Sequence, residues 1–375
     1  MINRLLNKSI LENFGKGKAI IILGSRQVGK STLLKHIAEI QKDKVLFLNC
    51  DDLQIKKSLE RQSFSELQRI IGTNQIIIID EAQRVTDIGL TLKILTDQFN
   101  FKQLLVSGSS SFELSNIINE PLTGRKFEYQ LFPFSIKELA DHFGYLNEKS
   151  SLKTRLIFGM YPDVINNQGN ETEILRNLAS SYLYKDILAY EGIRKPEFIE
   201  SLLEALALQM GSEVSYSELS QLLGSNSHTI QNYISILERA YIIFRLRSFS
   251  RNSRNEIKKS RKIYFYDNGI RNAILSNYND FDLRTDQGAL WENFVISERM
   301  KYLHYNKIYS KSYFWRTTQQ QEIDYLEEYN GKLTAFEIKW NTKEKVRFPL
   351  TFSSNYPDTE LLTINPDNIW DFVGV

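Results

Sequence analysis

The sequence predicts an α/β protein that begins with a doubly wound parallel sheet and continues into a helical region and a second α/β part. Three observations carry this prediction. Short apolar segments alternate with helical stretches up to about residue 143, apolar residues then follow a helical period over 151–208, and short strands return after residue 276. Alternating strands and helices are typical of a parallel sheet covered on both faces.

The expected elements follow from local patterns. Ser63-Phe64-Ser65-Glu66 is a capping box that begins a helix, two short helices around a tight turn near 216–239 predict a winged helix-turn-helix, and Asn330-Gly331 predicts a hairpin. The predicted strands are 19–23, 44–49, 75–80, 103–107, 127–132, 311–316, 322–327 and 333–340. We therefore expect four parts: a P-loop ATPase domain (1–145), a lid-like helical region (146–210), a winged helix (211–275) and a second α/β domain (276–375).

Composition narrows the class of protein. The chain has 375 residues, 42% of them hydrophobic and 25% charged, with a formal net charge of +2. No apolar stretch is long enough to span a membrane, so we expect a cytoplasmic protein without a membrane segment. The single cysteine, Cys50, excludes a disulfide framework within the chain and a cysteine-based zinc cluster.

The most specific motif lies between the first strand and the first long helix. Residues 24–31 have the pattern G-x-x-x-x-G-K-[ST] of a phosphate-binding loop. Backbone N–H groups in such a turn and at the helix N-terminus form a concave anion site. Lys30 is expected to reach the β- and γ-phosphates, and the Ser31 hydroxyl is expected to hold Mg²⁺. The predicted nucleotide contacts here are Gly24, Ser25, Arg26, Gln27, Val28, Gly29, Lys30, Ser31 and Thr32.

A second motif indicates that the nucleotide is hydrolysed and not only bound. Ile76-Ile77-Ile78-Ile79-Asp80-Glu81 is a buried strand that ends in two carboxylates. Asp80 is expected to hold Mg²⁺, through a bound water or beside Ser31. Glu81 is expected to polarise the water that attacks the γ-phosphate. The alternative is that the two carboxylates only cap the following turn.

Four segments together carry a family resemblance. Gly-Ser-Arg-Gln-Val-Gly-Lys-Ser, Ile-Ile-Asp-Glu-Ala-Gln-Arg, Val-Ser-Gly-Ser-Ser and Leu-Thr-Gly-Arg-Lys resemble a group of prokaryotic ATPases of the AAA+ superfamily that carry a C-terminal domain of unknown function. The resemblance implies ATP and Mg²⁺. It also implies that Ser107 or Ser109 is a polar sensor, and that Arg125 is an arginine finger for its own or a neighbouring subunit's site. The alternatives are a strand-end cap for Ser107 and a salt bridge for Arg125.

A basic run follows the predicted helix-turn-helix. Residues 245–262 hold eight basic side chains and one acid, Glu256; the basic ones are Arg245, Arg247, Arg251, Arg254, Lys258, Lys259, Arg261 and Lys262. Clustered positive charge beside such a motif indicates contact with a nucleic-acid backbone. The polar helix residues Ser227, His228, Gln231, Asn232 and Ser235 are candidates for reaching base edges. A protein–protein module or a solvated charged face would explain the same pattern.

The C-terminal part contains a second set of acids. Glu337 and Lys339 share one face of a strand, the hairpin brings Asp324 alongside, and Glu292 lies on an upstream helix with Glu298 as its rival. The pattern D…E-x-K resembles PD-(D/E)xK nucleases, including archaeal Holliday-junction resolvases, although no proline precedes Asp324. That resemblance implies a restriction-endonuclease-like fold, a catalytic set of Glu292, Asp324, Glu337 and Lys339, and Mg²⁺ on Asp324 and Glu337. The alternative is a degenerate scaffold with paired surface carboxylates.

Taken together, these features predict an ATP-binding and ATP-hydrolysing protein that acts on DNA or is regulated by it. Lys30 and Glu81 would carry the hydrolysis, and the C-terminal part would be a Mg²⁺-dependent nuclease-like domain. One alternative is an ATP-dependent switch that binds protein partners and has an inactive nuclease-like fold. Another is a remodelling or transport motor with no role on DNA. Assembly into a homo-oligomer is left open.

Overall fold

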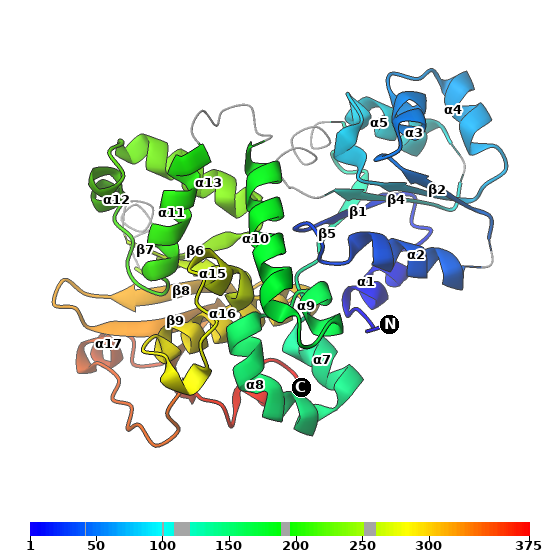
Figure 1. Cartoon of the computed structure of the whole chain (residues 1–375). Coiled ribbons are helices and arrows are strands. Elements are labelled where there is room, and N and C mark those ends of the chain that lie inside the picture. The colour runs from blue at the N-terminus through cyan, green and yellow to red at the C-terminus, as the bar shows by residue number, and fades with distance from the viewer. Residues whose placement is uncertain (42, 100, 109–120, 189–195, 251–259) are drawn as a thin grey trace. The chain divides into compact units, whose positions relative to one another are not determined.

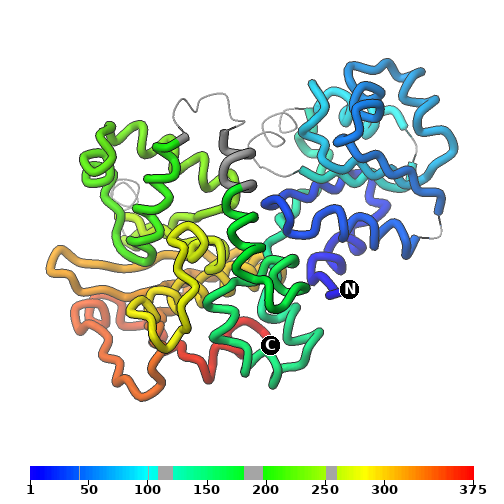
Figure 2. The backbone as a smooth tube through the Cα atoms, in the orientation of Figure 1, coloured from blue at the N-terminus to red at the C-terminus, as the bar shows by residue number. Residues whose placement is uncertain are grey.

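A computed structural model describes residues 1–375 except 42, 100, 109–120, 189–195 and 251–259 (Figure 1). The described residues form two compact units. Unit 1 holds Met1–Pro133 with Arg239–Tyr241, and unit 2 holds Phe134–Glu238 with Ile242–Val375. Figure 2 traces the chain through both units. The predicted α/β class is confirmed, with a parallel sheet first and a helical region with a second sheet after it.

Unit 1 is built on a parallel sheet in the order β2-β3-β4-β1-β5. Because all of its strands run the same way, their carboxyl ends meet at one edge, where ligands bind in open α/β sheets. β1 lies between β4 and β5, so the loop after β1 leaves from within the sheet. The strands are β1 (Ala19–Leu23), β2 (Val45–Asn49), β3 (Ile76–Asp80), β4 (Gln103–Gly108) and β5 (Lys126–Gln130).

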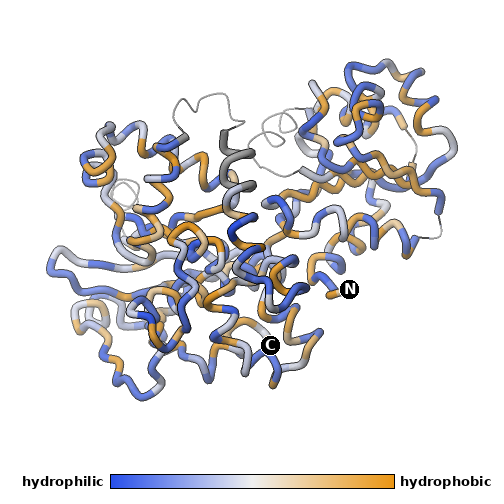
Figure 3. Tube along the Cα trace, in the orientation of Figure 1, coloured by the Kyte–Doolittle hydropathy of each residue, from blue (hydrophilic) through white to orange (hydrophobic). Residues whose placement is uncertain are grey.

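Helices cover both faces of this sheet because its central strands are apolar on both sides, as Figure 3 shows for β1 and its neighbours. Ile21, Ile77 and Val106 form one core with residues of α3, α4 and α5, and α2 contacts β3 and β4. The helices are α1 (Leu6–Glu12), α2 (Lys30–Ile40), α3 (Leu53–Leu59), α4 (Phe64–Ile71), the 3₁₀-helix η1 (Ala82–Arg84) and α5 (Ile88–Gln98). The capping box predicted at Ser63 begins α4.

Unit 2 begins with helices and contains the two short helices predicted before the basic run. α12 and α13 follow each other with a short turn between them, and α13 buries Ile230, Ile234 and Leu237. The helices of this unit are α7 (Ile136–Phe143), α8 (Tyr145–Phe158), α9 (Pro162–Asn166), α10 (Glu171–Leu188), α11 (Pro196–Leu208), α12 (Tyr216–Leu222), α13 (Ser227–Arg239), α15 (Asn268–Ile274), η2 (Phe281–Leu283), α16 (Gln287–Tyr305), α17 (Leu350–Asn355) and α18 (Ile369–Phe372).

A second sheet, in the order β11-β10-β9-β8-β6-β7, completes unit 2. The predicted hairpin is confirmed: Asn330 and Gly331 both have positive φ, 50° and 76°, as a two-residue turn requires, and this turn pairs Tyr329 with Lys332. The strands are β6 (Ile243–Ser248), β7 (Arg261–Phe265), β8 (Lys311–Arg316), β9 (Glu322–Tyr329), β10 (Lys332–Ile338) and β11 (Glu360–Ile364).

Two predicted boundaries do not coincide with a boundary between the units. α7 belongs to unit 2, although we expected the first domain to continue to residue 145. The second sheet also crosses the expected boundary at 275/276, because β6 pairs in parallel with β8 at Arg247 with Tyr313 and Ser248 with Phe314. β6 and β7, which lie in the range expected for the winged helix, therefore share a sheet with the C-terminal acids.

Candidate functional site

The phosphate-binding loop connects β1 to α2 at the carboxyl edge of the first sheet. Gln27 and Gly29 have positive φ, 59° and 95°, so the loop curls before the helix starts at Lys30. Gly24 packs so closely that a Cβ there would lie 2.3 Å from the carbonyl oxygen of Leu131. Glycine is required at that position because any side chain would displace the backbone.

Side chains hold this loop in shape. Lys30 is 4% exposed, and its Nζ donates hydrogen bonds to the carbonyl oxygens of Gly24 at 2.9 Å and Ser25 at 2.8 Å. Arg4 lies just before α1, and its Nη1 donates a hydrogen bond to the carbonyl oxygen of Val28 at 2.8 Å. Ser31 and Thr32 lie in the first turn of α2. The lysine ammonium is therefore held at the loop that sequence reasoning assigned to phosphate.

Asp80, Glu81 and Ser107 lie together at the ends of the neighbouring strands β3 and β4. The Ser107 hydroxyl donates to Asp80 Oδ1, and it accepts the backbone N–H of Glu81 at 3.1 Å. Asp80 is only 3% exposed and Ser107 is fully buried. The structure thus links the three residues that the sequence proposed separately. Ser109, the other sensor candidate, lies outside the described residues.

Sequence reasoning gave no role to Gln83, which contacts the predicted base. Its Nε2 donates a hydrogen bond of 2.6 Å to Glu81 Oε2. Glu81 has a left-handed backbone, with φ 55° and ψ 41°, which is uncommon for a residue other than glycine and is often found at functional sites. In the sequence, the only indication of this contact is that Gln83 follows Glu81 by two residues.

The acids also affect Cys50, which follows β2. Burial, and then the charges of Asp80, Asp51 and Glu81, raise the pKa of the Cys50 thiol to about 12. The thiol therefore stays protonated at neutral pH, which makes it neither a nucleophile nor a ready metal ligand.

These residues fit a nucleoside triphosphate with Mg²⁺. The loop supplies backbone N–H groups, a cradle that a Cβ would fill at Gly24, and the Lys30 ammonium for phosphate oxygens. The Ser31 hydroxyl and the Asp80 carboxylate are the oxygen ligands that Mg²⁺ prefers. Bound there, Mg²⁺ would offset the negative charge of the phosphates.

Arg125 lies at the edge of the sheet opposite the phosphate-binding loop, which argues against a role at its own site, one of the two that the resemblance left open. It precedes β5, and its carbonyl oxygen accepts the N–H of Ala19 at the start of β1. The length of β1 therefore separates it from the phosphate-binding loop by roughly 15 Å along the strand. Its Nε pairs with Asp97 Oδ1 at 2.5 Å, the salt bridge that was the alternative. A role at a neighbouring subunit's site stays a prediction.

In unit 2 the predicted C-terminal residues do converge. Lys339 Nζ lies 3.0 Å from Glu337 Oε2 and 3.6 Å from Asp324 Oδ2. The backbone N–H of Ile338 donates to Asp324 Oδ2 at 2.8 Å. The hairpin register places Asp324 beside Glu337, as the sequence predicted. Burial and the Asp324 charge raise the pKa of Glu337 to about 7.

Glu292 joins this group through Tyr264, which sequence reasoning missed, and through Lys262, which it placed in the basic run. Tyr264 donates its hydroxyl to Glu292 Oε1 at 2.6 Å, and Lys262 Nζ lies 3.1 Å from the same oxygen. Lys262 also lies 2.5 Å from Glu322 Oε1 on β9. Burial, opposed by Lys262 and aided by Asp324, raises the pKa of Glu292. We call Glu292, Glu322, Asp324 and Glu337 the acid cluster.

The rival residue Glu298 is excluded from the cluster. It is 1% exposed, pairs with Lys301 at 2.6 Å, and accepts the backbone N–H of Ile136 at 2.6 Å. Its role is to join α16 to the start of α7. Within the part of the chain that the structure describes, no group of three or more His, Cys, Asp or Glu side chains is arranged to hold a metal ion. Asp324 and Glu337 instead share a pairing with Lys339, and the Mg²⁺ site expected on them stays a prediction.

Three of the predicted basic residues make contacts within unit 2. Arg245 pairs with Glu238, Arg261 stacks 4.2 Å from the centre of the Tyr216 ring, and Lys262 is buried in the acid cluster. Arg247 is exposed on β6. Arg251, Arg254, Lys258 and Lys259, with Glu256, lie outside the described residues.

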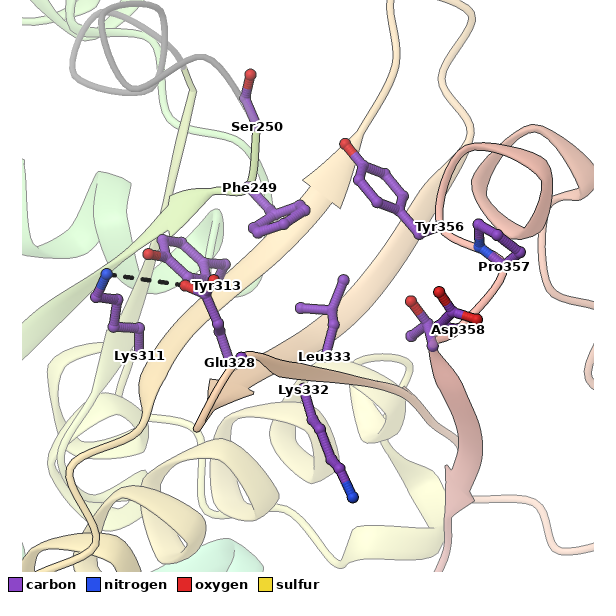
Figure 4. A pocket seen from close by; sticks show the side chains of 12 residues that line it. Phe249, Ser250, Lys311, Tyr313, Glu328, Lys332, Leu333, Tyr356, Pro357 and Asp358 are labelled. Carbon is purple, nitrogen blue, oxygen red and sulfur yellow. Dashed lines mark ion pairs between the residues drawn. The ribbon is translucent and has the colours of Figure 1, made fainter.

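A separate cavity of about 450 Å³ opens beside the β9–β10 hairpin (Figure 4). Phe249, Tyr313, Leu333 and Tyr356 form its apolar wall, and an ion pair between Lys311 and Glu328 of 3.8 Å lies at its rim. No member of the predicted catalytic set lines this cavity.

Family models match three consecutive parts of the chain. Residues 16–140 match a model described as an AAA domain, 149–280 match a domain of unknown function (DUF8612), and 287–368 match a domain of unknown function (DUF4143). The first match agrees with the fold of unit 1 and supports an ATP-binding AAA+ protein. None of the described helices has the length and apolar character that crossing a membrane requires.

Relatives that match most of the chain come from bacteria and archaea. An uncharacterized protein of Haemophilus influenzae is 26% identical over 352 residues, covering 86% of this chain and 84% of its own. Uncharacterized proteins of Mycobacterium tuberculosis and Methanocaldococcus jannaschii are each 26% identical, covering 86% of this chain and 70% and 75% of their own. The similarity therefore runs through both units.

Solved structures resemble the chain only loosely. The structure of the Aeropyrum pernix ORC1 protein in complex with DNA has a TM-score of 0.33 and 13% identity, covering 72% of this chain and 91% of that one. The structure of Drosophila ORC bound to AT-rich DNA and Cdc6 has a TM-score of 0.25 and 13% identity, covering 72% and 90%. TM-scores this low do not establish a common arrangement of the whole chain.

Proposed function

We propose that unit 1 hydrolyses ATP, with Lys30 and Ser31 on the phosphates and Mg²⁺, Asp80 on the metal and Glu81 as general base. The observation that carries this proposal is the Ser107 hydroxyl, which joins Asp80 and Glu81 at the sheet edge where the phosphate-binding loop begins. A passive binding site would need the loop alone. A strained, hydrogen-bonded carboxylate beside the metal ligand is what a hydrolytic site adds.

The test is a comparison of Glu81→Gln with the wild type. Glu81→Gln removes the base and keeps the shape of the side chain, so we expect the rate of ATP hydrolysis to fall by about 100- to 10,000-fold. ATP binding, measured with a fluorescent ATP analogue, should stay within about threefold of wild type. Lys30→Ala, in contrast, should weaken ATP binding in addition to slowing hydrolysis.

Glu39→Gln is the matched control, because Glu39 is exposed on α2 of the same unit. It should leave both binding and hydrolysis unchanged. Undiminished hydrolysis in Glu81→Gln would refute the assignment of the base. Wild-type protein that binds ATP without turning it over, under Mg²⁺, would reduce unit 1 to a binding switch.

DNA contact through α13 is the second candidate. This helix buries its apolar side and exposes His228, Gln231 and Asn232, which are side chains able to reach base edges or phosphates. The basic residues between 251 and 259 add charge next to it in the sequence. Arg245 and Lys262 do not add to this charge, because both form ion pairs within unit 2.

A salt series with duplex DNA tests this candidate. Binding should weaken as salt rises, because phosphate contacts release counterions. Gln231→Ala with Asn232→Ala should weaken binding, whereas Ser150→Ala on α8 should not. Absence of binding at low salt would instead favour the alternative of a switch that acts on protein partners. Mg²⁺-dependent nuclease activity in unit 2 stays a prediction from the sequence.

A further inference from the structure

The side chain of Lys262 lies among the four acids of the cluster and is more deeply buried than any of them. Its side chain is 1% exposed, although it belongs to a run of basic residues expected to face solvent. It starts on β7, and its ammonium lies 5.6 Å from the centre of the Phe314 ring on β8. In the sheet, β8 and β6 lie between β9 and the edge strand β7. The lysine side chain therefore extends across the sheet to reach the acids.

The ammonium joins carboxylates from two different elements. Glu292 comes from α16 and Glu322 from β9, at 3.1 and 2.5 Å from Lys262 Nζ. Bridging carboxylates of separate elements is the structural task that a divalent cation performs in a metal site. Tyr264, two residues along β7, donates to the same Glu292 oxygen and holds it toward the lysine.

The remaining acids also have protein cations. Lys339 contacts Asp324 and Glu337, and Arg316 Nη1 lies 3.3 Å from Glu322 Oε2. Each of the four carboxylates in the cluster therefore contacts at least one lysine or arginine. A metal ion placed between Glu292 and the β9 acids would have to displace Lys262 or lie against it, and like charges in a partly buried site repel strongly.

We infer that Lys262 is the resident cation of the acid cluster and fills the position that a divalent metal ion would occupy between Glu292 and the β9 carboxylates. A residue from the range expected for the winged helix then holds the predicted nuclease-like residues together and occupies the space between them. This inference does not depend on ATP hydrolysis in unit 1.

The experiment measures metal binding by the full-length, nucleotide-free protein with terbium luminescence, excited through its aromatic residues. Binding at the cluster is defined as the signal that Glu292→Gln removes. The wild type should show no such signal. Lys262→Met should gain it, at terbium concentrations at least about tenfold below the highest at which the wild type still shows none. Lys332→Met, an exposed lysine of the same sheet, should behave as wild type.

Two results would overturn the inference. One is wild-type binding that Glu292→Gln removes, since a metal would then bind beside Lys262. The other is a folded Lys262→Met protein with no gain in binding, since the lysine would then not be what keeps the metal out. Should Lys262→Met fail to fold, the thermal midpoint of the wild type with and without Mn²⁺ decides. An upward shift that Glu292→Gln abolishes refutes the inference, and the absence of one supports it.

Discussion

The two units each bring acids and lysines together beside a sheet, but they use the charges differently. In unit 1, Lys30 donates to neutral carbonyl oxygens, and Asp80 and Glu81 accept from the hydroxyl-bearing Ser107 and the amide of Gln83. In unit 2, Lys262 and Lys339 contact the carboxylates directly. Similar residue types therefore produce two different sites.

This difference decides how much charge each site keeps available for a ligand. Neutral hydrogen-bonding partners orient a charge without cancelling it, so the Asp80 and Glu81 carboxylates of unit 1 keep their attraction for Mg²⁺. Direct ion pairs cancel charge within the protein, and removing one partner leaves the other buried and uncompensated. We therefore expect substitutions in unit 1 to act on catalysis and those in unit 2 to act on stability.

The largest effect should come from Lys262→Met. Loss of the ammonium leaves Glu292 without a cation and Glu322 with Arg316 alone, which should lower the free energy of unfolding by about 3 kcal/mol. Urea denaturation of the full chain measures this change. Adding Glu292→Gln should restore part of the loss, because it removes the charge left without a cation. A loss below about 1 kcal/mol would mean that the pair is effectively solvated.

A smaller, pH-dependent effect should come from Asp286, which pairs with Arg271 and with Arg284, the latter at 2.8 Å. These arginines outweigh burial and lower the pKa of Asp286 from 3.8 to about 2. Because the folded-state pKa is the lower one, the stabilisation is complete above about pH 4 and is lost as the pH falls toward 2.

Its size at neutral pH should be about 2 kcal/mol. Urea denaturation of wild type and Asp286→Asn at several pH values measures it. The difference between the two proteins should shrink as the pH falls below 4. A difference that is constant with pH would show that the aspartate acts through shape and not through charge.

The smallest effect should be catalytic, in Gln83→Ala. This change removes the amide that holds Glu81, so kcat for ATP hydrolysis should fall by about three- to tenfold while KM stays unchanged. Steady-state kinetics measure the split, and stability should be nearly unaffected because Gln83 is only half-buried. An unchanged kcat would show that the backbone alone positions Glu81.

Local sequence patterns were enough for much of the fold and for the site in unit 1. The phosphate-binding loop, the Asp80-Glu81 strand and the Asn330-Gly331 turn are contiguous, and each needs only its own neighbours to take shape. The meeting of Asp324, Glu337 and Lys339 was predictable for the same reason, since one short hairpin sets their register. The role expected of Ser107 came from the family resemblance and not from a local pattern.

The tertiary structure alone decided where the separate segments meet. Arg125 precedes its strand, and only the parallel pairing of β1 with β5 shows that it lies at the edge away from the loop. Lys262 looked like part of a solvent-facing basic run until the pairing of β6 with β8 brought its strand into the sheet of the acids. The sequence by itself determined which charges the protein has. Only the packing of distant strands decided which of them are neutralised within the protein, because charges interact through space and not along the chain.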